Sequence, residues 1–343
     1  MEARAQDPPS FAGNQMIHSI TAHNINHAFM DAWHYLRSAG VEESSRNGPV
    51  LVAPGPVITT YLNPVQRVLF NPRRDANAVF HLIEALWMLA GDSDTAWLRQ
   101  FNSNIPLYAE PDGHIHGAYG LRWRYWFLDQ GNEPFDQIKT VIDLLRRDPA
   151  TRQAVVQMWD PGADLEGDWR DRPCNTAIYF DCRGGKLNMT VTCRSNDILW
   201  GCYGANVVHM SMLQELVAHA VNRPVGVYRQ FSNNWHAYLG NPQVQNFLDT
   251  PPMETHDYYA ERNVRPYPLL QGSEQYEHLL EDCDYFLEGR TSMRTHFMRD
   301  VAVPLRDTYL ARTGGEKVNW ISLPEYCDWT VAFAEWCDRR DGK

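Results

Sequence analysis

The stretch from Arg172 to Asp197, RPCNTAIYFDCRGGKLNMTVTCRSND, is the part of the chain around which the rest can be interpreted. Apolar and polar residues alternate on both sides of Gly184 and Gly185, a pattern typical of two strands joined by a tight turn. The predicted hairpin carries the thiol of Cys174 at its start and the guanidinium of Arg194 near its end. We interpret Cys174 as a nucleophile and Arg194 as the group that holds an anionic substrate.

Composition limits the classes of function that the chain can have. Its 343 residues allow one large domain or two, and 44% hydrophobic and 12% aromatic residues are ample for a packed core. The net charge of −11 and the lack of a basic run argue against general binding to nucleic acids or membrane surfaces, so a phosphate would have to meet a local group of arginines. Seven cysteines, an odd number without a C-x-x-C pair, favour free thiols in a reducing compartment over disulfides or zinc. No metal site is expected.

The two regions that could direct the chain to a membrane do not fit that role. The N-terminus lacks the apolar segment of a signal peptide. The longest apolar stretch, residues 78–91, contains His81 and Glu84 and is too short to span a bilayer. We therefore expect a soluble, cytoplasmic protein with a flexible lead over residues 1–15.

Periodicity and turn residues predict the order of elements. The expected helices cover residues 20–39, 77–89, 136–147, 206–221, 274–287, 293–302 and 324–337, the last with Ser322 as a possible cap and Pro324 in its first turn. The expected strands, besides the hairpin, cover residues 57–62, 67–70, 154–159 and 225–231. We divide the chain into a catalytic domain, residues 16–270, and a helical C-terminal extension, residues 271–343, which could be a third layer, a dimer contact or a lid.

Two residues upstream of the hairpin are candidate functional residues because of their local sequence surroundings. Glu84 is the one carboxylate in the very apolar helix 77–89, so it is either a structural polar contact or a catalytic acid or base. Tyr119 lies between Gly117 and Gly120, which indicates a tightly shaped backbone around its side chain.

Seven motifs in this chain resemble, in the same order, those of thymidylate synthase and its relatives, the pyrimidine nucleotide hydroxymethylases. They are Glu84-Ala-Leu-Trp87-Met-Leu-Ala-Gly91, Tyr119-Gly120-Leu-Arg-Trp123-Arg124, Asp148-Pro-Ala-Thr151-Arg152, Pro173-Cys174-Asn175, Cys193-Arg194-Ser195-Asn196-Asp197, Trp200-Gly201 through Asn206, and Asn234-Trp235-His236-Ala237-Tyr238. Arg46-Asn-Gly48 is a fainter echo of a further family motif. Each is weak alone, but their order over about residues 20–250 makes chance a poor explanation. The resemblance implies an α/β fold of three layers, with a mixed, bent β-sheet packed by helices, to which the C-terminal extension is added.

The same resemblance implies folate-dependent one-carbon transfer to C5 of a pyrimidine nucleotide, with 5,10-methylenetetrahydrofolate as the donor. Cys174 would add to C6 and make C5 nucleophilic, and an adjacent arginine would help to keep the thiol ionised. Tyr119 would assist removal of the C5 proton, and Glu84 would organise water and protons near the base. Asp197 would complete the catalytic set.

Binding roles also follow from the resemblance. Arg194 would bind the 5′-phosphate in a bidentate manner, and Arg152 would reach the same phosphate from the partner subunit of a twofold homodimer. Arg46 and Ser195 would also bind the substrate. The sugar hydroxyl would be held by His236 and Tyr238, and the folate by Arg74, Asp197 and Gly201. Singly, each of these residues also has an ordinary interpretation. Cys174 fits a small buried residue, Tyr119 a core tyrosine, Asp197 a turn residue and His236 a surface residue, while Arg46, Arg74 and Arg122 fit solvated or structural roles.

Asn206 is the residue from which we predict which pyrimidine base the protein binds. One residue more than in the family pattern separates it from Gly201, which leaves Ala205 or Asn206 as the base-reading residue, and the thirty-residue step to His236 selects Asn206. An asparagine offers a donor to O4 and an acceptor to N3–H of uracil, whereas relatives that use cytosine carry aspartate there. We expect uracil, although a flipped amide could also pair with cytosine.

Four departures from the family bear on the product. Asn175 replaces a histidine, Gln153 replaces an arginine, residues 104–108 lack a tryptophan that packs near folate, and the short apolar tail that closes the site is absent. Hydride transfer to the methylene group needs a dry, closed site, so a looser one favours attack by water. We therefore expect hydroxymethylation of dUMP to 5-hydroxymethyl-dUMP, with thymidylate synthesis, dCMP or CMP hydroxymethylation and a non-catalytic binding homologue as alternatives.

Overall fold

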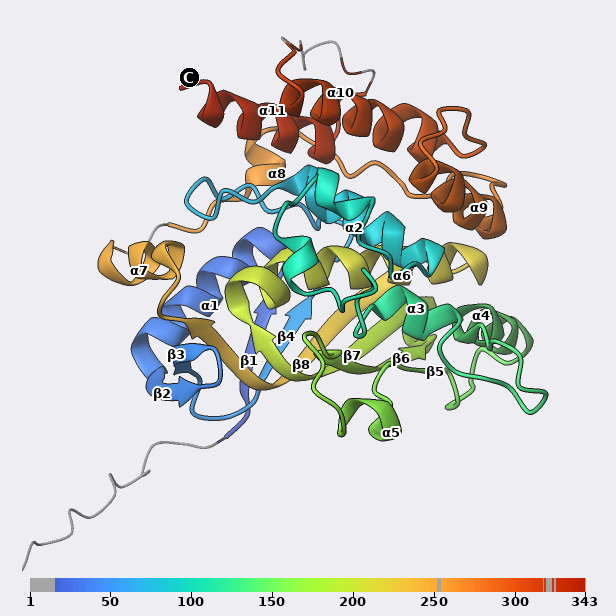
Figure 1. Cartoon of the computed structure of the whole chain (residues 1–343), viewed down its shortest axis with the longest axis horizontal. Helices are drawn as coiled ribbons and strands as arrows, with labels where there is room; N and C mark the ends of the chain where they lie inside the picture. The colour runs from blue at the N-terminus through green and yellow to red at the C-terminus, as the bar shows by residue number, and fades with distance from the viewer. Residues whose placement is uncertain (1–15, 252–253, 317, 319–322, 324, 343) are drawn as a thin grey trace, which may run out of the picture.

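The sheet at the base of the molecule is mixed, and every strand of it comes from the first 238 residues (Figure 1). The computed structural model describes residues 16–251, 254–316, 318, 323 and 325–342. The predicted lead, Ser322 and Pro324 lie outside these residues. Among the described residues the order of strands is β1-β4-β8-β7-β6-β5, and β3 pairs with both β2 and β8. The pairs β1–β4 and β7–β8 are parallel, and the others are antiparallel.

The strands are β1 (His18–Ala22), β2 (Val41–Ser45), β3 (Gly48–Val52), β4 (Val57–Tyr61), β5 (Val155–Gln157), β6 (Asn175–Asp181), β7 (Leu187–Asp197) and β8 (Val225–Tyr238). The predicted hairpin is β6–β7. Gly184 and Gly185 at its turn have φ of 66° and 73°, which glycine adopts without strain. The helices are α1 (Ile25–Ala39), α2 (Ala78–Ala90), α3 (Tyr119–Arg124), α4 (Gln137–Arg147), α5 (Pro161–Asp164), α6 (Asn206–Ala220), α7 (Pro242–Asp249), α8 (Tyr258–Glu261), α9 (Tyr276–Leu287), α10 (Val303–Thr313) and α11 (Asp328–Arg340).

Helices are stacked in layers on one face of the sheet. α1 and α6 lie against the strands, α2 packs on α6, and α9, α10 and α11 pack on the opposite side of α2 (Figure 1). All residues of α2 are buried except Glu84, as expected for a helix covered on both sides. This layering confirms the predicted mixed α/β fold, and the C-terminal helices occupy the position of an outer layer.

Several predicted boundaries were wrong because tertiary contacts replaced local ones. The helix predicted from residue 20 begins at Ile25, since residues 18–22 pair with β4 and the Asn24 side chain caps the helix. Residues 67–70 form no strand: the Val68 amide donates to Tyr259 Oη, and Asn26 hydrogen-bonds the backbone of Val68 and Phe70.

The C-terminal helices were also displaced from their predicted positions. The helix predicted over residues 293–302 starts instead with a π-helical segment, Met298–Ala302, and continues as α10 with a proline in its first turn. The helix predicted over residues 324–337 is α11, which begins at Asp328. No helix among the described residues has both the length and the apolar character needed to cross a membrane.

Candidate active site

A cavity of about 450 Å³ lies beside α2, the start of α6 and the end of β7. Seven of the residues predicted for the site line it, namely Glu84, Tyr119, Cys174, Ser195, Asp197, Gly201 and Asn206. The hairpin β6–β7 brings Cys174 and Asp197 to the same end of the sheet, and α6 begins with Asn206 directly after the π-helical segment Ile198–Ala205. Residues from five separate motifs therefore meet in one cavity.

Arg194 holds the loop that carries the candidate nucleophile. Its backbone N–H donates to Cys174 O at 2.9 Å, its Nε to Pro173 O at 2.9 Å and its Nη2 to Arg172 O at 3.3 Å. The predicted bidentate grip on a phosphate needs a correction here, because these carbonyls occupy the Nε–Nη2 edge. Nη1, which makes no hydrogen bond to any described residue, is left to meet an anion.

The Cys174 thiol is less acidic than the sequence led us to expect. Burial raises its pKa to about 11, and the charge of Arg194, which lowers the pKa, does not compensate. Asp171 and Asp197 raise it further. Arg194 therefore acts on the thiol in the expected direction, but desolvation of Cys174 has the larger effect on its pKa.

Tyr119 lies next to the nucleophile because two glycines allow close backbone approach. A Cβ at Gly117 would lie 2.3 Å from Asp171 Oδ2, and one at Gly120 would lie 2.1 Å from Met88 O. The Tyr119 hydroxyl accepts a hydrogen bond from the backbone N–H of Asn175 at 3.3 Å. Burial, and then the negative charge of a Cys174 thiolate, raise the pKa of Tyr119 well above its usual value. The phenol therefore keeps its proton at neutral pH and can donate a hydrogen bond.

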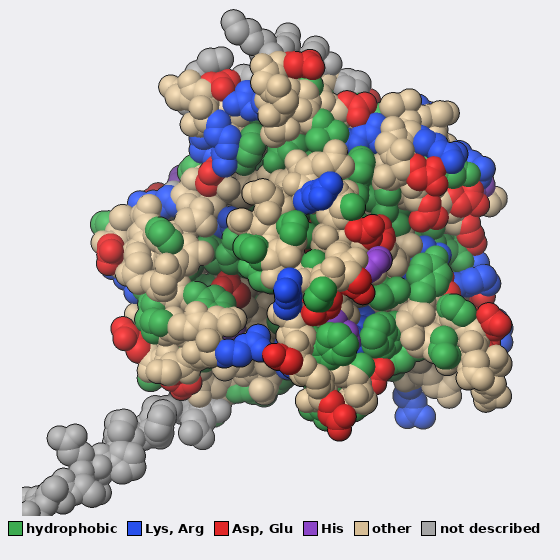
Figure 2. Space-filling view, in the orientation of Figure 1, with side chains coloured by type: hydrophobic (Ala, Val, Ile, Leu, Met, Phe, Trp, Pro, Cys, Tyr) green, Lys and Arg blue, Asp and Glu red, His purple; other side chains and the backbone are tan. Residues whose placement is uncertain are grey.

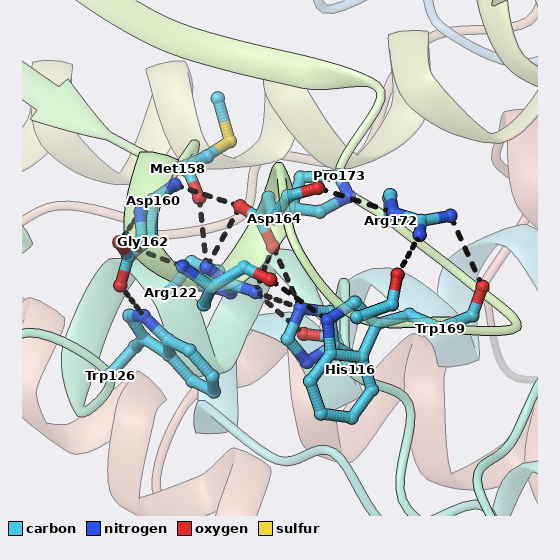
Figure 3. A network of polar contacts seen from close by, with 12 residues as sticks. His116, Arg122, Trp126, Met158, Asp160, Gly162, Asp164, Trp169, Arg172 and Pro173 are labelled. Atoms are coloured by element: carbon cyan, nitrogen blue, oxygen red, sulfur yellow. Dashed lines mark hydrogen bonds and ion pairs between the residues drawn. The ribbon is translucent and has the colours of Figure 1, made fainter.

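A buried ion pair anchors the chain that leads into Cys174 (Figure 3). Asp164 accepts from Arg122 Nη2 at 2.8 Å and lies 2.7 Å from His116 Nε2, while the Arg122 guanidinium lies 3.7 Å from the centre of the Trp126 ring. The backbone carbonyl of Asp164 accepts from Arg172 Nε at 3.2 Å. Arg122 is fully buried, so of its two interpretations the structural one holds.

A chain of hydrogen bonds sets the orientation of the Asn206 amide. Asn206 Nδ2 donates to Asn196 Oδ1 at 3.3 Å, and Asn196 Nδ2 donates to Ser232 Oγ at 3.0 Å. Burial raises the pKa of the Cys202 thiol to about 12, and the hydrogen bond with Ser232 is among the contacts that lower it, as expected where a hydroxyl donates to sulfur. With this assignment Asn206 keeps one N–H and its Oδ1 for a ligand.

Gly201 makes this amide chain possible. A Cβ at that position would lie 2.7 Å from Asn196 Oδ1 and 3.0 Å from Asn206 Nδ2. A side chain there would therefore displace both amides.

Asp197 and Trp200 form the part of the cavity that best fits a flat heterocycle. Asp197 Oδ1 accepts from the backbone N–H groups of Leu199 and Trp200 at 2.6 and 2.8 Å, and Oδ2 makes no hydrogen bond to a described residue. Burial raises the Asp197 pKa. The Trp200 ring is half exposed at the cavity. A pterin, which has N–H groups along one edge, matches this pair of an acceptor and an aromatic face.

The remaining predicted residues do not line the cavity. Arg74 is buried and donates through Nε to Leu199 O at 3.0 Å, so it supports the segment before α6 instead of contacting a cofactor. His236 is buried and opposite Asp197 in the β7–β8 ladder, and Tyr238 packs edge-on against it. Arg46, at the β2–β3 turn, and Arg152, before β5, are exposed.

The cavity residues that were not predicted as functional include His81, Asp171, Trp200 and His209. His81 and His209 lie three residues from Glu84 and Asn206 on their helices, so helical spacing could have indicated them. Burial raises the Asp171 pKa to about 6. Its position depends on a loop, and no local pattern predicts it. No group of His, Cys, Asp and Glu among the described residues is arranged to hold a metal ion.

Comparisons with known proteins agree with this geometry. The family model described as thymidylate synthase matches residues 29–285. A deoxyuridylate hydroxymethyltransferase of Pseudomonas phage M6 is 40% identical over 337 residues, 94% of each chain. A deoxyuridylate hydroxymethyltransferase of Bacillus phage SP01 is 37% identical over 189 residues, 54% of this chain and 49% of that protein. The chain belongs to the thymidylate synthase family.

Proposed function

We propose that this protein transfers a one-carbon unit to C5 of dUMP and releases 5-hydroxymethyl-dUMP. The observation that carries the proposal is that the Cys174 thiol shares a cavity with an Asn206 amide whose free groups complement uracil. The two similar phage proteins that are named deoxyuridylate hydroxymethyltransferase support the same activity.

Covalent catalysis begins at Cys174. Addition of its thiolate to C6 moves electron density to C5 and O4, and the Asn206 N–H can stabilise the charge that develops on O4. The thiol must first lose a proton, because its pKa is about 11. Asp171, which lines the same cavity with a pKa of about 6, is mostly ionised at pH 7 and is suited to accept that proton.

Later proton transfers fall to Tyr119 and Glu84. Both line the cavity, one at the start of α3 and the other on α2. Tyr119 assists departure of the C5 proton, and Glu84 orders water at the base. Asp197, Gly201 and Trp200 would hold 5,10-methylenetetrahydrofolate, which would supply the carbon at the oxidation level of formaldehyde.

We propose a twofold homodimer in which the partner completes the phosphate site. Arg194, Ser195 and Arg46 would hold the phosphate together with Arg152 donated by the other subunit, and His236 and Tyr238 would hold the sugar. Tyr179 and Val155, paired across β5 and β6, are exposed hydrophobic residues on the sheet, which supports a covered interface there. In Figure 2, lysines and arginines are scattered over the visible face and form no large basic area, which supports a small anionic ligand over nucleic acid.

Access of water favours the hydroxymethyl product over the methyl product. Leu107 and Tyr108, in the segment where the family has a tryptophan, line the cavity while 71% and 52% exposed. Such a wall leaves the methylene carbon within reach of solvent, which competes with hydride.

Product analysis tests the proposal. The enzyme is incubated with dUMP and 5,10-methylenetetrahydrofolate, and the nucleotide is weighed by mass spectrometry. We expect 5-hydroxymethyl-dUMP without dihydrofolate absorbance. A methylated product with that absorbance would contradict the hydroxymethylase assignment, and absence of tritium release from [5-³H]dUMP would contradict catalysis altogether.

A further inference from the structure

His209 is a buried imidazole in the cavity with unmet hydrogen-bonding capacity. It is 2% exposed; its Nδ1 has no hydrogen-bond partner among the described residues, and its Nε2 makes only an ion-pair contact, which lacks the alignment of a hydrogen bond. Because α6 places residues three apart on one face, His209 projects beside the base-reading Asn206. Buried polar atoms in native proteins are normally paired, so the ring is expected to meet a water molecule or a ligand.

The facing helix supplies a carboxylate to this imidazole. Glu84, the residue of α2 that is not buried, has its Oε2 3.0 Å from His209 Nε2. α2 and α6 pack side by side, so the pair bridges the two helices that bound the cavity (Figure 1). A carboxylate beside an imidazole stabilises the imidazolium that forms when the ring accepts a proton.

The surroundings disfavour a second cation nearby. His81, one turn before Glu84, is buried, and burial, followed by the charge of Arg74, lowers its pKa well below the usual value. His81 is therefore neutral. Within this set, the imidazole with its own carboxylate partner is His209.

We propose that His209, positioned by Glu84, is the base that takes the proton from the water that attacks the methylene carbon. The inference rests on the proposed hydroxymethylase function and assigns its final step. The water oxygen forms a bond to the exocyclic carbon on C5, and the π electrons of that C=C bond move to C5 and O4. The proton passes to His209. The C5=C6 double bond then re-forms as the Cys174 sulfur leaves C6 as a thiolate. No oxidant or reductant is consumed.

Substitution His209→Gln tests this step while keeping a polar side chain of similar reach. We expect formation of 5-hydroxymethyl-dUMP to fall by at least about 100-fold, the usual contribution of a general base. Tritium release from [5-³H]dUMP in the first turnover, which precedes water attack, should keep its wild-type rate. Intact-protein mass after quenching should then reveal a nucleotide adduct on Cys174.

An added thiol separates a missing base from a misfolded site. The thiolate of 2-mercaptoethanol attacks the methylene carbon without a base, so the variant should form the corresponding 5-thioether of dUMP. Equilibrium binding of dUMP without folate should be unchanged. His219→Gln is the matched control, because His219 lies on the same helix but bonds to Glu274 O outside the cavity.

Each further outcome overturns a defined part of the argument. Wild-type hydroxymethylation by His209→Gln would refute the role of His209, as would a parallel fall in tritium release. A wild-type enzyme that releases tritium but forms dTMP would overturn the proposed function, and the inference with it.

Discussion

The amide of Asn206 has two ends that differ only in whether they donate or accept a hydrogen bond, so its neighbours decide which end faces the cavity. Asn196 and Ser232 set the orientation of the Asn206 amide through a directed chain of hydrogen bonds. Cys174 is likewise controlled by its surroundings, since burial holds its pKa near 11 although a cation is close. At the scale of single residues, orientation and desolvation determine the chemistry.

The substitution Asn206→Asp tests whether the Asn206 amide selects uracil as the base. A carboxylate cannot donate to O4, and an unmatched buried polar pair costs up to about 3 kcal/mol, so kcat/KM for dUMP should fall about 100-fold. Activity with dCMP should rise relative to dUMP. Tritium release from the two 5-labelled nucleotides measures both values, and an unchanged ratio would contradict the assigned role.

Ser232→Ala tests the chain that orients Asn206. Loss of the Ser232 acceptor frees Asn196 to flip, so the preference for dUMP over dCMP should fall by roughly fivefold, the value of one hydrogen bond of about 1 kcal/mol. Ser211→Ala is the matched control, because Ser211 is equally buried but bonds to Val208 O. If both variants change the preference equally, the effect does not come from the chain.

The helix α2 links the site to the C-terminal helices. Its sequence is apolar all round because α6 covers one side and α9, α10 and α11 cover the other. Tyr309 of α10 accepts from Asn77, the cap of α2, and donates to Phe101 O. We propose that residues 271–343 act as an outer layer that fixes α2, and with it Glu84, and that residues 16–270 form the catalytic domain.

Asp328 makes the attachment of this layer dependent on pH. It lies at the start of α11, accepts from Tyr259 Oη at 3.0 Å, and has its pKa raised by burial from 3.8 to about 7. Between these values the folded state binds a proton that the unfolded state lacks, so stability falls as pH rises from about 4 to 7.

Asp328→Asn should remove that loss of stability. Relative to the wild type, the variant should gain on the order of 4 kcal/mol at pH 8 and little near pH 4. Urea unfolding midpoints of both proteins at the two pH values give the comparison. Equal dependence on pH in both would show that Asp328 is ionised in the folded protein.

At the scale of the whole molecule, layers of helices cover one face of the sheet. Tyr179 of β6 and Val155 of β5 are hydrophobic residues of the sheet that remain exposed. Arg152 is exposed and away from the cavity of its own chain. Both features fit a twofold dimer whose subunits each complete the site of the other.

Mixing two inactive variants tests this arrangement. Arg152→Ala removes the donated arginine and Cys174→Ser removes the nucleophile, so each homodimer should lose activity. After unfolding and refolding together in equal amounts, about one quarter of the sites should have both residues intact. Tritium release measures the recovery, and no recovery from a mixture that forms dimers would contradict donation of Arg152.

The sequence by itself determined the family and the hairpin, and it supplied the candidates for nucleophile and base-reading residue, because these depend on residue order and spacing. The number of residues between Asn206 and His236, for example, does not depend on how the chain packs. Only the tertiary structure decided three other features. Residues 67–70 form no strand, Arg194 uses one edge of its guanidinium to hydrogen-bond the loop before Cys174, and His209 contacts Glu84. The hydrogen-bond partners and the burial of these side chains depend on elements that are distant in the chain, so local sequence patterns do not predict them.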